Sequence, residues 1–128
     1  MIGIVIVAHG RLAAEYQAAV EHVVGTQPNI KSVSIEARDD RADKEIEICQ
    51  AADSVDTGEG VVLVIDLFGS TASNLSLRAC RPSGRRILYG ANLPMLVKLA
   101  KMREKPLQQA VDAALAAGRK YINTMEVS

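Results

Sequence analysis

The 128-residue sequence contains few aromatic side chains, with no Trp, one Phe and three Tyr. Proteins that stack nucleic-acid bases or enclose a flavin depend on such rings, so these ligand classes are disfavoured. Basic and acidic residues number 15 each, and the formal net charge is zero. No basic excess is therefore present to neutralise nucleic-acid phosphates or anionic lipid, and we expect no nucleic-acid partner.

Cysteines and long apolar runs are also scarce. Cys49 and Cys80 form no CxxC motif and have no His or Cys at metal-ligand spacing, so we expect two buried thiols in a reducing cytosol. The N-terminal run 2–7 is too short for a signal peptide, and no stretch reaches the roughly 20 apolar residues of a membrane span. The sequence predicts a cytoplasmic protein without membrane insertion, cofactor or metal.

The remaining composition is that of a folded domain. Hydrophobic residues make up 48% and charged residues 23%, and the length predicts a single domain over residues 1–128. Runs rich in Val and Ile alternate with longer amphipathic patterns. This alternation is typical of an α/β protein with a mostly parallel sheet and helices on both faces.

The pattern can be divided into individual elements. We expect strands at 2–7, 32–36, 61–65 and 86–89. Between them we expect helices at 12–24, about 40–55 and about 71–81, followed by two helices that open near Pro94 and Pro106. The tail 120–127 alternates loosely and predicts an additional edge strand.

Candidate functional residues lie where two of these strands end. In open parallel sheets, ligands bind beyond the carboxyl ends of the strands, where the connections reverse direction. His9 follows the first strand and Asp66 the third, so the two face each other if these strands are neighbours. An imidazole tied to a carboxylate keeps one tautomer and presents its other nitrogen as a nucleophile. The N–H and hydroxyl groups of Gly69, Ser70 and Thr71 predict an adjacent phosphoryl-binding site.

Each of these residues also has a purely structural interpretation. A histidine after a strand is often packed or capping, and an aspartate there often forms a turn. Ser70 and Thr71 can simply cap the next helix. Arg11 either steers phosphate or is solvated. The combination of His9 and Asp66 favours function more than either residue alone.

Three short motifs follow the predicted first, third and fourth strands, namely His9-Gly10, Asp66-x-Phe68-Gly69 and Gly90-x-Asn92-x-Pro94-Met95-Leu96. In their order and spacing the chain resembles, over nearly its whole length, the mannose-type EIIA component of the bacterial phosphotransferase system. The third motif is the most specific.

The resemblance implies a flavodoxin-like doubly wound sheet and a homodimer that exchanges C-terminal strands. It also implies a phosphotransferase role, in which phosphorylated HPr would donate a phosphoryl group to His9 and Asp66 would orient the ring. Thr71 occupies the place where the family usually has Ser at the start of the phosphate-facing helix. The acceptor would be an EIIB component that serves sugar uptake, or the chain would end a regulatory phosphorelay.

The chain also departs from the family pattern. The family commonly shows Trp and then Gly-Gly-Ser-Pro-Phe where residues 68–73 read Phe-Gly-Ser-Thr-Ala-Ser. This keeps the hydroxyls but changes the apolar surface that would face a partner. No EIIB segment follows Ser128, which predicts a stand-alone component. Two alternatives stay open: a phosphoryl-transfer subunit of a dihydroxyacetone kinase system, and a non-catalytic flavodoxin-like module that binds an anion or regulates a partner.

Overall fold

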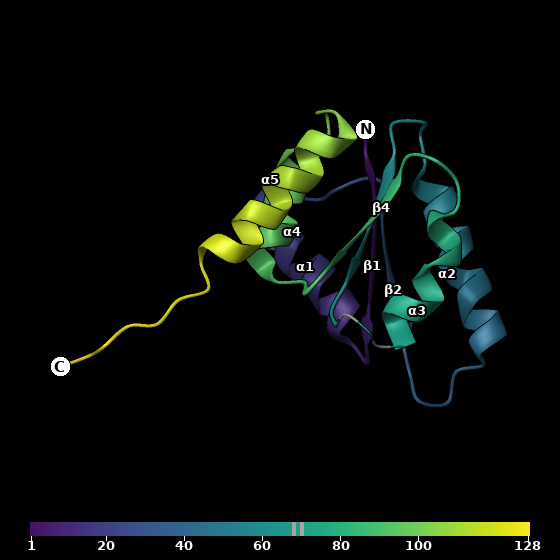
Figure 1. Ribbon diagram of the computed structural model, residues 1–128, viewed down its shortest axis with the longest axis horizontal. Coiled ribbons are helices and arrows are strands. Elements are labelled where there is room, and N and C mark those ends of the chain that lie inside the picture. The colour runs from purple at the N-terminus through teal and green to yellow at the C-terminus, as the bar shows by residue number, and fades with distance from the viewer. Residues whose placement is uncertain (68, 70) are drawn as a thin grey trace.

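The computed structural model describes residues 1–67, 69 and 71–128. Four parallel strands form one sheet in the order β2-β1-β3-β4, with helices on both faces (Figure 1). This confirms the predicted flavodoxin-like α/β fold. The elements are β1 (Gly3–His9), α1 (Leu12–Val24), β2 (Ile30–Ile35), α2 (Arg41–Val55), β3 (Val61–Ile65), α3 (Thr71–Ser76), a 3₁₀ turn (Arg78–Cys80), β4 (Arg85–Tyr89), α4 (Leu93–Lys101) and α5 (Leu107–Lys120).

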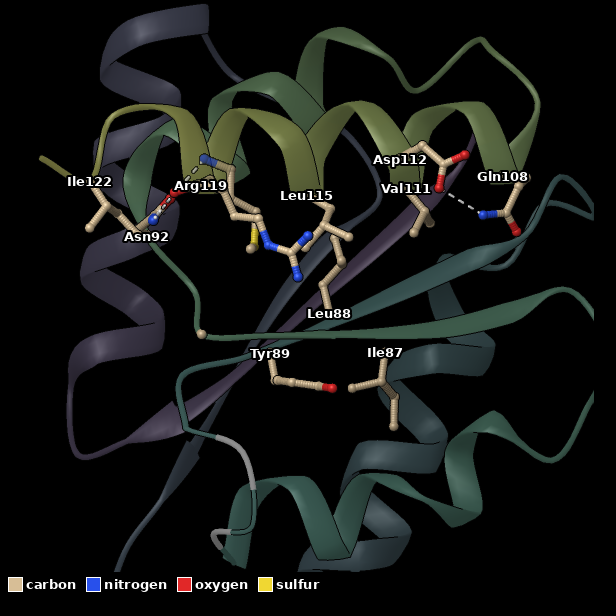
Figure 2. A pocket seen from close by; sticks show the side chains of 13 residues that line it. Ile87, Leu88, Tyr89, Asn92, Gln108, Val111, Asp112, Leu115, Arg119 and Ile122 are labelled. Carbon is tan, nitrogen blue, oxygen red and sulfur yellow. Dashed lines mark hydrogen bonds between the residues drawn. The ribbon is translucent and has the colours of Figure 1, made fainter.

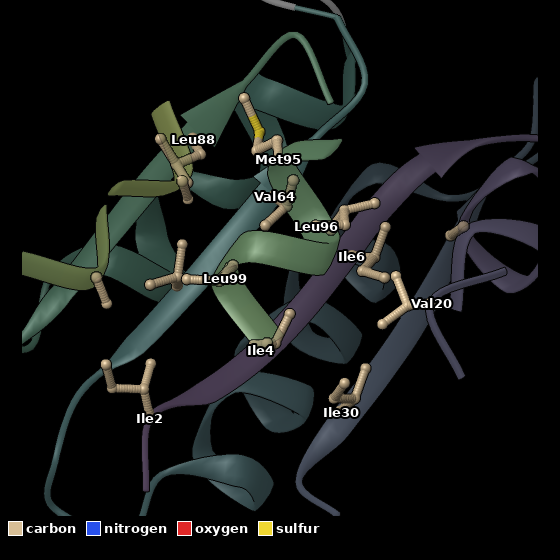
Figure 3. Packing of buried hydrophobic residues seen from close by; sticks show 14 of the residues in the cluster. Ile2, Ile4, Ile6, Val20, Ile30, Val64, Leu88, Met95, Leu96 and Leu99 are labelled. Carbon is tan, nitrogen blue, oxygen red and sulfur yellow. The ribbon is translucent and has the colours of Figure 1, made fainter. Parts of the chain in front are cut away.

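The central strand β1 separates two hydrophobic layers because successive side chains of a strand point to opposite faces. Ile4 and Ile6 pack under α1, α4 and α5, as Figure 3 shows for Ile6 with Val20 and Leu96. Val5 and Val7 pack on the other face, under α2 and α3. His9, two residues beyond Val7, therefore projects on the α2 and α3 face.

A buried arginine connects the edge strand β4 to α2. The Arg85 side chain is only 5% exposed. Its Nη2 group donates to Asp53 Oδ1 at 2.8 Å and to Asp56 Oδ2 at 3.1 Å, and its Nη1 group donates to the Ala79 carbonyl at 2.9 Å. The guanidinium thus ties the strand to the C-terminal end of α2 and to the 3₁₀ turn.

Two predicted elements differ from the structure. The helix expected over 71–81 consists of the short α3 and a separate 3₁₀ turn. The edge strand expected over 120–127 is not formed: α5 continues to Lys120, and the tail extends away from the body of the protein (Figure 1). A strand needs a neighbour for its backbone hydrogen bonds, and within the described part of this chain the tail pairs with none.

The two cysteines are free, and both are only half-buried, whereas the sequence predicted buried thiols. Both thiols lie against the hydrophobic layer under α2 and α3. Burial raises the pKa of the Cys80 thiol to about 11. This thiol therefore stays protonated at neutral pH, which fits a packing role.

Candidate functional site

His9 and Asp66 meet at the carboxyl ends of the neighbouring strands β1 and β3. Asp66 Oδ2 lies 2.9 Å from His9 Nδ1 and accepts the backbone N–H of His9 at 3.0 Å. An ionised carboxylate only accepts hydrogen bonds, so Nδ1 carries the proton and Nε2 keeps a free lone pair. The His9 side chain is 47% exposed and that of Asp66 is 11% exposed. The arrangement holds Nδ1 against the carboxylate on a ring that is about half exposed.

The turn after His9 is held by β2. Gly10 donates its N–H to the Ile35 carbonyl at 2.9 Å, and its own carbonyl accepts the Ser34 hydroxyl at 2.6 Å. The φ of Gly10 is +58°, in the left-handed region that glycine adopts without steric cost. These bonds fix the backbone that carries the imidazole. Sequence reasoning missed Ser34, whose role depends on pairing between β1 and β2.

A hollow of about 530 Å³ opens beside His9 on the α2 and α3 face. Its wall combines apolar side chains with both signs of charge, and it is formed by the ends of β1 and β2, the β2–α2 loop and the starts of α2 and α3. The lining residues are His9, Ile35, Glu36, Ala37, Asp39, Arg41, Thr71 and Leu75. The crevice rule pointed to the loops after β1, β3 and β4, and the loop after β2 was missed.

The predicted phosphoryl-binding segment lies only partly at this hollow. Thr71 is exposed and lines it. The Gly69 N–H donates to the Ser73 hydroxyl of α3 at 3.0 Å, so this donor is already engaged by the helix. Ser70 lies outside the described residues. Among the described members of the segment, Thr71 is therefore the one that the structure places at the hollow with His9.

The third motif of the sequence, around Asn92, has a structural task. Asn92 Oδ1 accepts the Met95 N–H at 3.0 Å and caps α4, and its Nδ2 group donates to the Gly118 carbonyl of α5 at 2.8 Å. Arg11 is solvated: its side chain is 91% exposed and pairs loosely with Glu15 at 3.9 Å. Neither side chain lines the hollow at His9.

Residues 1–67, 69 and 71–128 contain neither a metal-binding cluster nor a membrane-spanning helix. No group of three or more His, Cys, Asp or Glu side chains is arranged there to hold a metal ion. No helix of the same residues has the length and apolar character that crossing a bilayer requires.

A parallel α/β sheet with a histidine and a carboxylate joined at its crevice defines a class of protein suited to nucleophilic or group-transfer chemistry on an imidazole. The family model described as the PTS system fructose IIA component matches residues 3–116. The chain therefore belongs to this EIIA family. Membership assigns it a phosphotransferase role in the phosphotransferase system for sugars. In a separate comparison, no curated protein matches the chain.

Solved structures show the same fold. An EIIA component from Streptococcus agalactiae is 23% identical to this chain, with 97% of this chain and 97% of that chain covered and a TM-score of 0.85. The mannose/sorbose IIA subunit from Enterococcus faecalis is 21% identical, with 98% of this chain and 96% of that chain covered and a TM-score of 0.86. A PTS IIA protein of a fucose utilization operon from Streptococcus pneumoniae is 23% identical, with 95% and 92% covered and a TM-score of 0.82.

Proposed function

We propose that His9 accepts a phosphoryl group from phosphorylated HPr and passes it to an EIIB component, or holds it as the end point of a regulatory phosphorelay. The observation that carries this proposal is the contact between His9 Nδ1 and Asp66 Oδ2 at 2.9 Å. It leaves Nε2, on a half-exposed ring, as the atom that a partner protein reaches.

In the first step, the Nε2 lone pair of His9 attacks phosphorus in line with the leaving nitrogen of the donor histidine. The N–P bond of the donor breaks, and its electron pair returns to the donor ring. His9 becomes cationic while Nδ1 keeps its proton, and the adjacent Asp66 carboxylate stabilises that cation. Positioning and contacts to the equatorial oxygens supply most of the catalysis, because the transition state is loose.

In the second step, a histidine nitrogen or cysteine sulfur of the acceptor attacks the same phosphorus. The Nε2–P bond breaks, and its electron pair returns to the His9 ring. Thr71 lines the hollow beside His9 and supplies a hydroxyl donor for the phosphoryl oxygens. Covering of the site by each partner protein excludes water and limits hydrolysis of the phosphorylated histidine.

The test is phosphoryl transfer from labelled HPr to the wild-type chain and to His9→Ala. We expect label in the wild type and a complete loss in the variant. His22, the other histidine of the chain, is an exposed residue of α1, so His22→Ala is the matched control and keeps its label. Equal labelling of wild type and His9→Ala would remove His9 from the mechanism.

We also propose that the functional unit is a homodimer in which two chains exchange their tails. The strand β4 lies at the edge of the sheet, and a hollow of about 370 Å³ separates it from α5. Figure 2 shows Leu88 projecting from β4 towards Leu115 of α5, whereas Ile87 and Tyr89 point to the other side of the strand. An extended segment added at this edge would satisfy its backbone and place alternate side chains on either side.

A further inference from the structure

Three charged side chains line the hollow beside His9, and two of them are already engaged. Glu36 Oε1 lies 3.0 Å from the Ser34 hydroxyl and shares its one proton with the Gly10 carbonyl. Asp39 Oδ2 accepts the Glu36 N–H at 2.7 Å and lies 3.5 Å from Lys44 Nζ. Arg41 is the third.

Arg41 is the cation of this hollow that has no partner within the described chain. It is the first residue of α2 and is exposed, and its side chain forms no hydrogen bond or ion pair with any residue in the ranges 1–67, 69 and 71–128. The helix cap is supplied by its neighbour Asp40, whose side chain accepts the Asp43 N–H at 3.0 Å. The guanidinium of Arg41 is therefore available to a ligand in the hollow.

We infer that Arg41 binds the phosphoryl group during its transfer to and from His9, an inference that rests on the function proposed above. His9 projects on the α2 and α3 face and shares the hollow with Arg41. A guanidinium offers paired N–H donors that match two phosphoryl oxygens, and it stays charged at any physiological pH. The equatorial oxygens carry the negative charge of the loose transition state, so their stabilisation speeds the reaction.

The other charges at the site strengthen the need for such a cation. Glu36 and Asp39 repel an incoming phosphoryl group, and Arg41 offsets this repulsion within the same hollow. Arg41 gives up no proton: the Nε2–P bond forms and the donor N–P bond breaks while the guanidinium holds the oxygens.

Two phosphoryl donors of different size distinguish an Arg41 contact to the phosphoryl group from an Arg41 contact to the partner protein. Phosphorylated HPr is a protein that must dock on the chain. Phosphoramidate is a small molecule that needs no docking surface, and when it transfers its phosphoryl group its nitrogen leaves as ammonia. Wild type, Arg41→Gln, Arg41→Lys and Arg11→Gln are compared with both donors. Arg11→Gln is the matched control, because Arg11 is an exposed arginine that does not line the hollow.

We expect Arg41→Gln to phosphorylate at least about tenfold more slowly with both donors, as loss of a charge-assisted donor to the reacting group implies. With phosphorylated HPr the loss falls on kcat and leaves KM nearly unchanged. Arg41→Lys, which keeps the charge without the fork, recovers part of the rate. Arg11→Gln stays within about twofold of the wild type.

Melting curves accompany each variant, and we expect shifts below about 2 °C because Arg41 is an exposed residue without partners. An unchanged rate in Arg41→Gln with both donors would overturn the inference. So would a loss confined to phosphorylated HPr, which would make Arg41 a docking residue. If the wild type takes label from neither donor, the proposed function itself fails, and the role of Arg41 fails with it.

Discussion

At the scale of single residues, Asp66 accepts two hydrogen bonds from one neighbour. Its Oδ2 atom receives both the backbone N–H and the ring Nδ1–H of His9, at 3.0 and 2.9 Å. The backbone bond fixes where the carboxylate lies, and the ring bond then fixes the tautomer and orientation of the imidazole. The second oxygen, Oδ1, is buried and has no hydrogen-bond partner in the described part of the chain. In the proposed mechanism, Asp66 therefore orients the imidazole and stabilises the charge that forms on it.

Asp66→Asn removes the charge and keeps the size of the side chain. We expect the rate of phosphoryl transfer to His9 to fall by at least about tenfold, because the cation formed on the ring loses its counter-charge. The melting temperature should change little. The rate is measured with phosphorylated HPr, and the fold is checked by circular dichroism. An unaltered rate in a folded variant would show that the carboxylate only shapes the turn.

At the scale of elements, the Arg85 cluster links β4 to α2. The pKa of Asp56 is lowered by the Gly58 N–H that its side chain accepts, and further by the Arg85 guanidinium. Asp56 therefore stabilises the folded state more when it is ionised than when it is protonated. Because its pKa in the folded protein lies below the ordinary value of 3.8, the stabilisation is complete above about pH 4 to 5 and is lost as the pH falls below that range.

Asp56→Asn tests this link through the pH dependence of stability. We expect the free energy of unfolding of the wild type to fall more steeply between about pH 5 and pH 3 than that of the variant. Urea unfolding at several pH values measures the difference. Glu59 follows the same turn, and its exposed side chain forms no hydrogen bond or ion pair with the described residues, so Glu59→Gln is the control. Identical slopes in wild type and Asp56→Asn would contradict the role of the ionised Asp56.

The sequence predicted best those elements whose burial is continuous. The runs that became β1 and β3 are apolar throughout, because the central strands of a parallel sheet are covered on both faces. Within the amphipathic helices, Val23 and Ile46 are exposed, whereas Ala13 and Ile48 are buried, so hydrophobic character alone does not mark the buried face. Periodicity fixes the spacing of a stripe, and tertiary packing decides which of two adjacent stripes faces the sheet.

The candidate site was predictable only where it depends on the order of the strands. His9 and Asp66 could be paired because parallel neighbouring strands end at the same edge of a sheet. Arg41 could not be found in this way, because its position depends on the path of the loop from β2 to α2. The engagement of Glu36 and Asp39, which leaves Arg41 as the available charge, likewise depends on contacts within that loop.

At the scale of the whole molecule, the proposed dimer would bring together the outer edge of β4 and the extended tail. Ile122, Met125 and Val127 of the tail are all exposed, as is Tyr89 of β4. A single chain therefore leaves these apolar groups exposed, and the outer edge of β4 has no neighbouring strand among the described residues. Covering both by a second copy removes this cost without any change in the two layers of the fold.

Removal of residues 121–128 tests the exchange. We expect the wild type to sediment as two chains at micromolar concentration and the shortened chain to sediment as one. Met125→Asp should weaken the dimer, because it places a charge on an apolar contact of the tail. Thr124→Asp, on the opposite side of an extended segment, is its control. A monomeric wild type at micromolar concentration would contradict the proposed exchange.

The pairing of β1 with β3 has a consequence for misfolded forms of the protein. Val7 stands opposite Ile65 in this ladder, and His9 and Asp66 follow from that alignment. A slip of β3 by a single residue would still bury apolar side chains, but it would turn the carboxylate to the opposite face of the sheet. The helix content and the compactness of the chain would hardly change with such an error. Phosphorylation of the histidine would, so the competent fraction of a preparation reports how much of it has folded in the correct alignment.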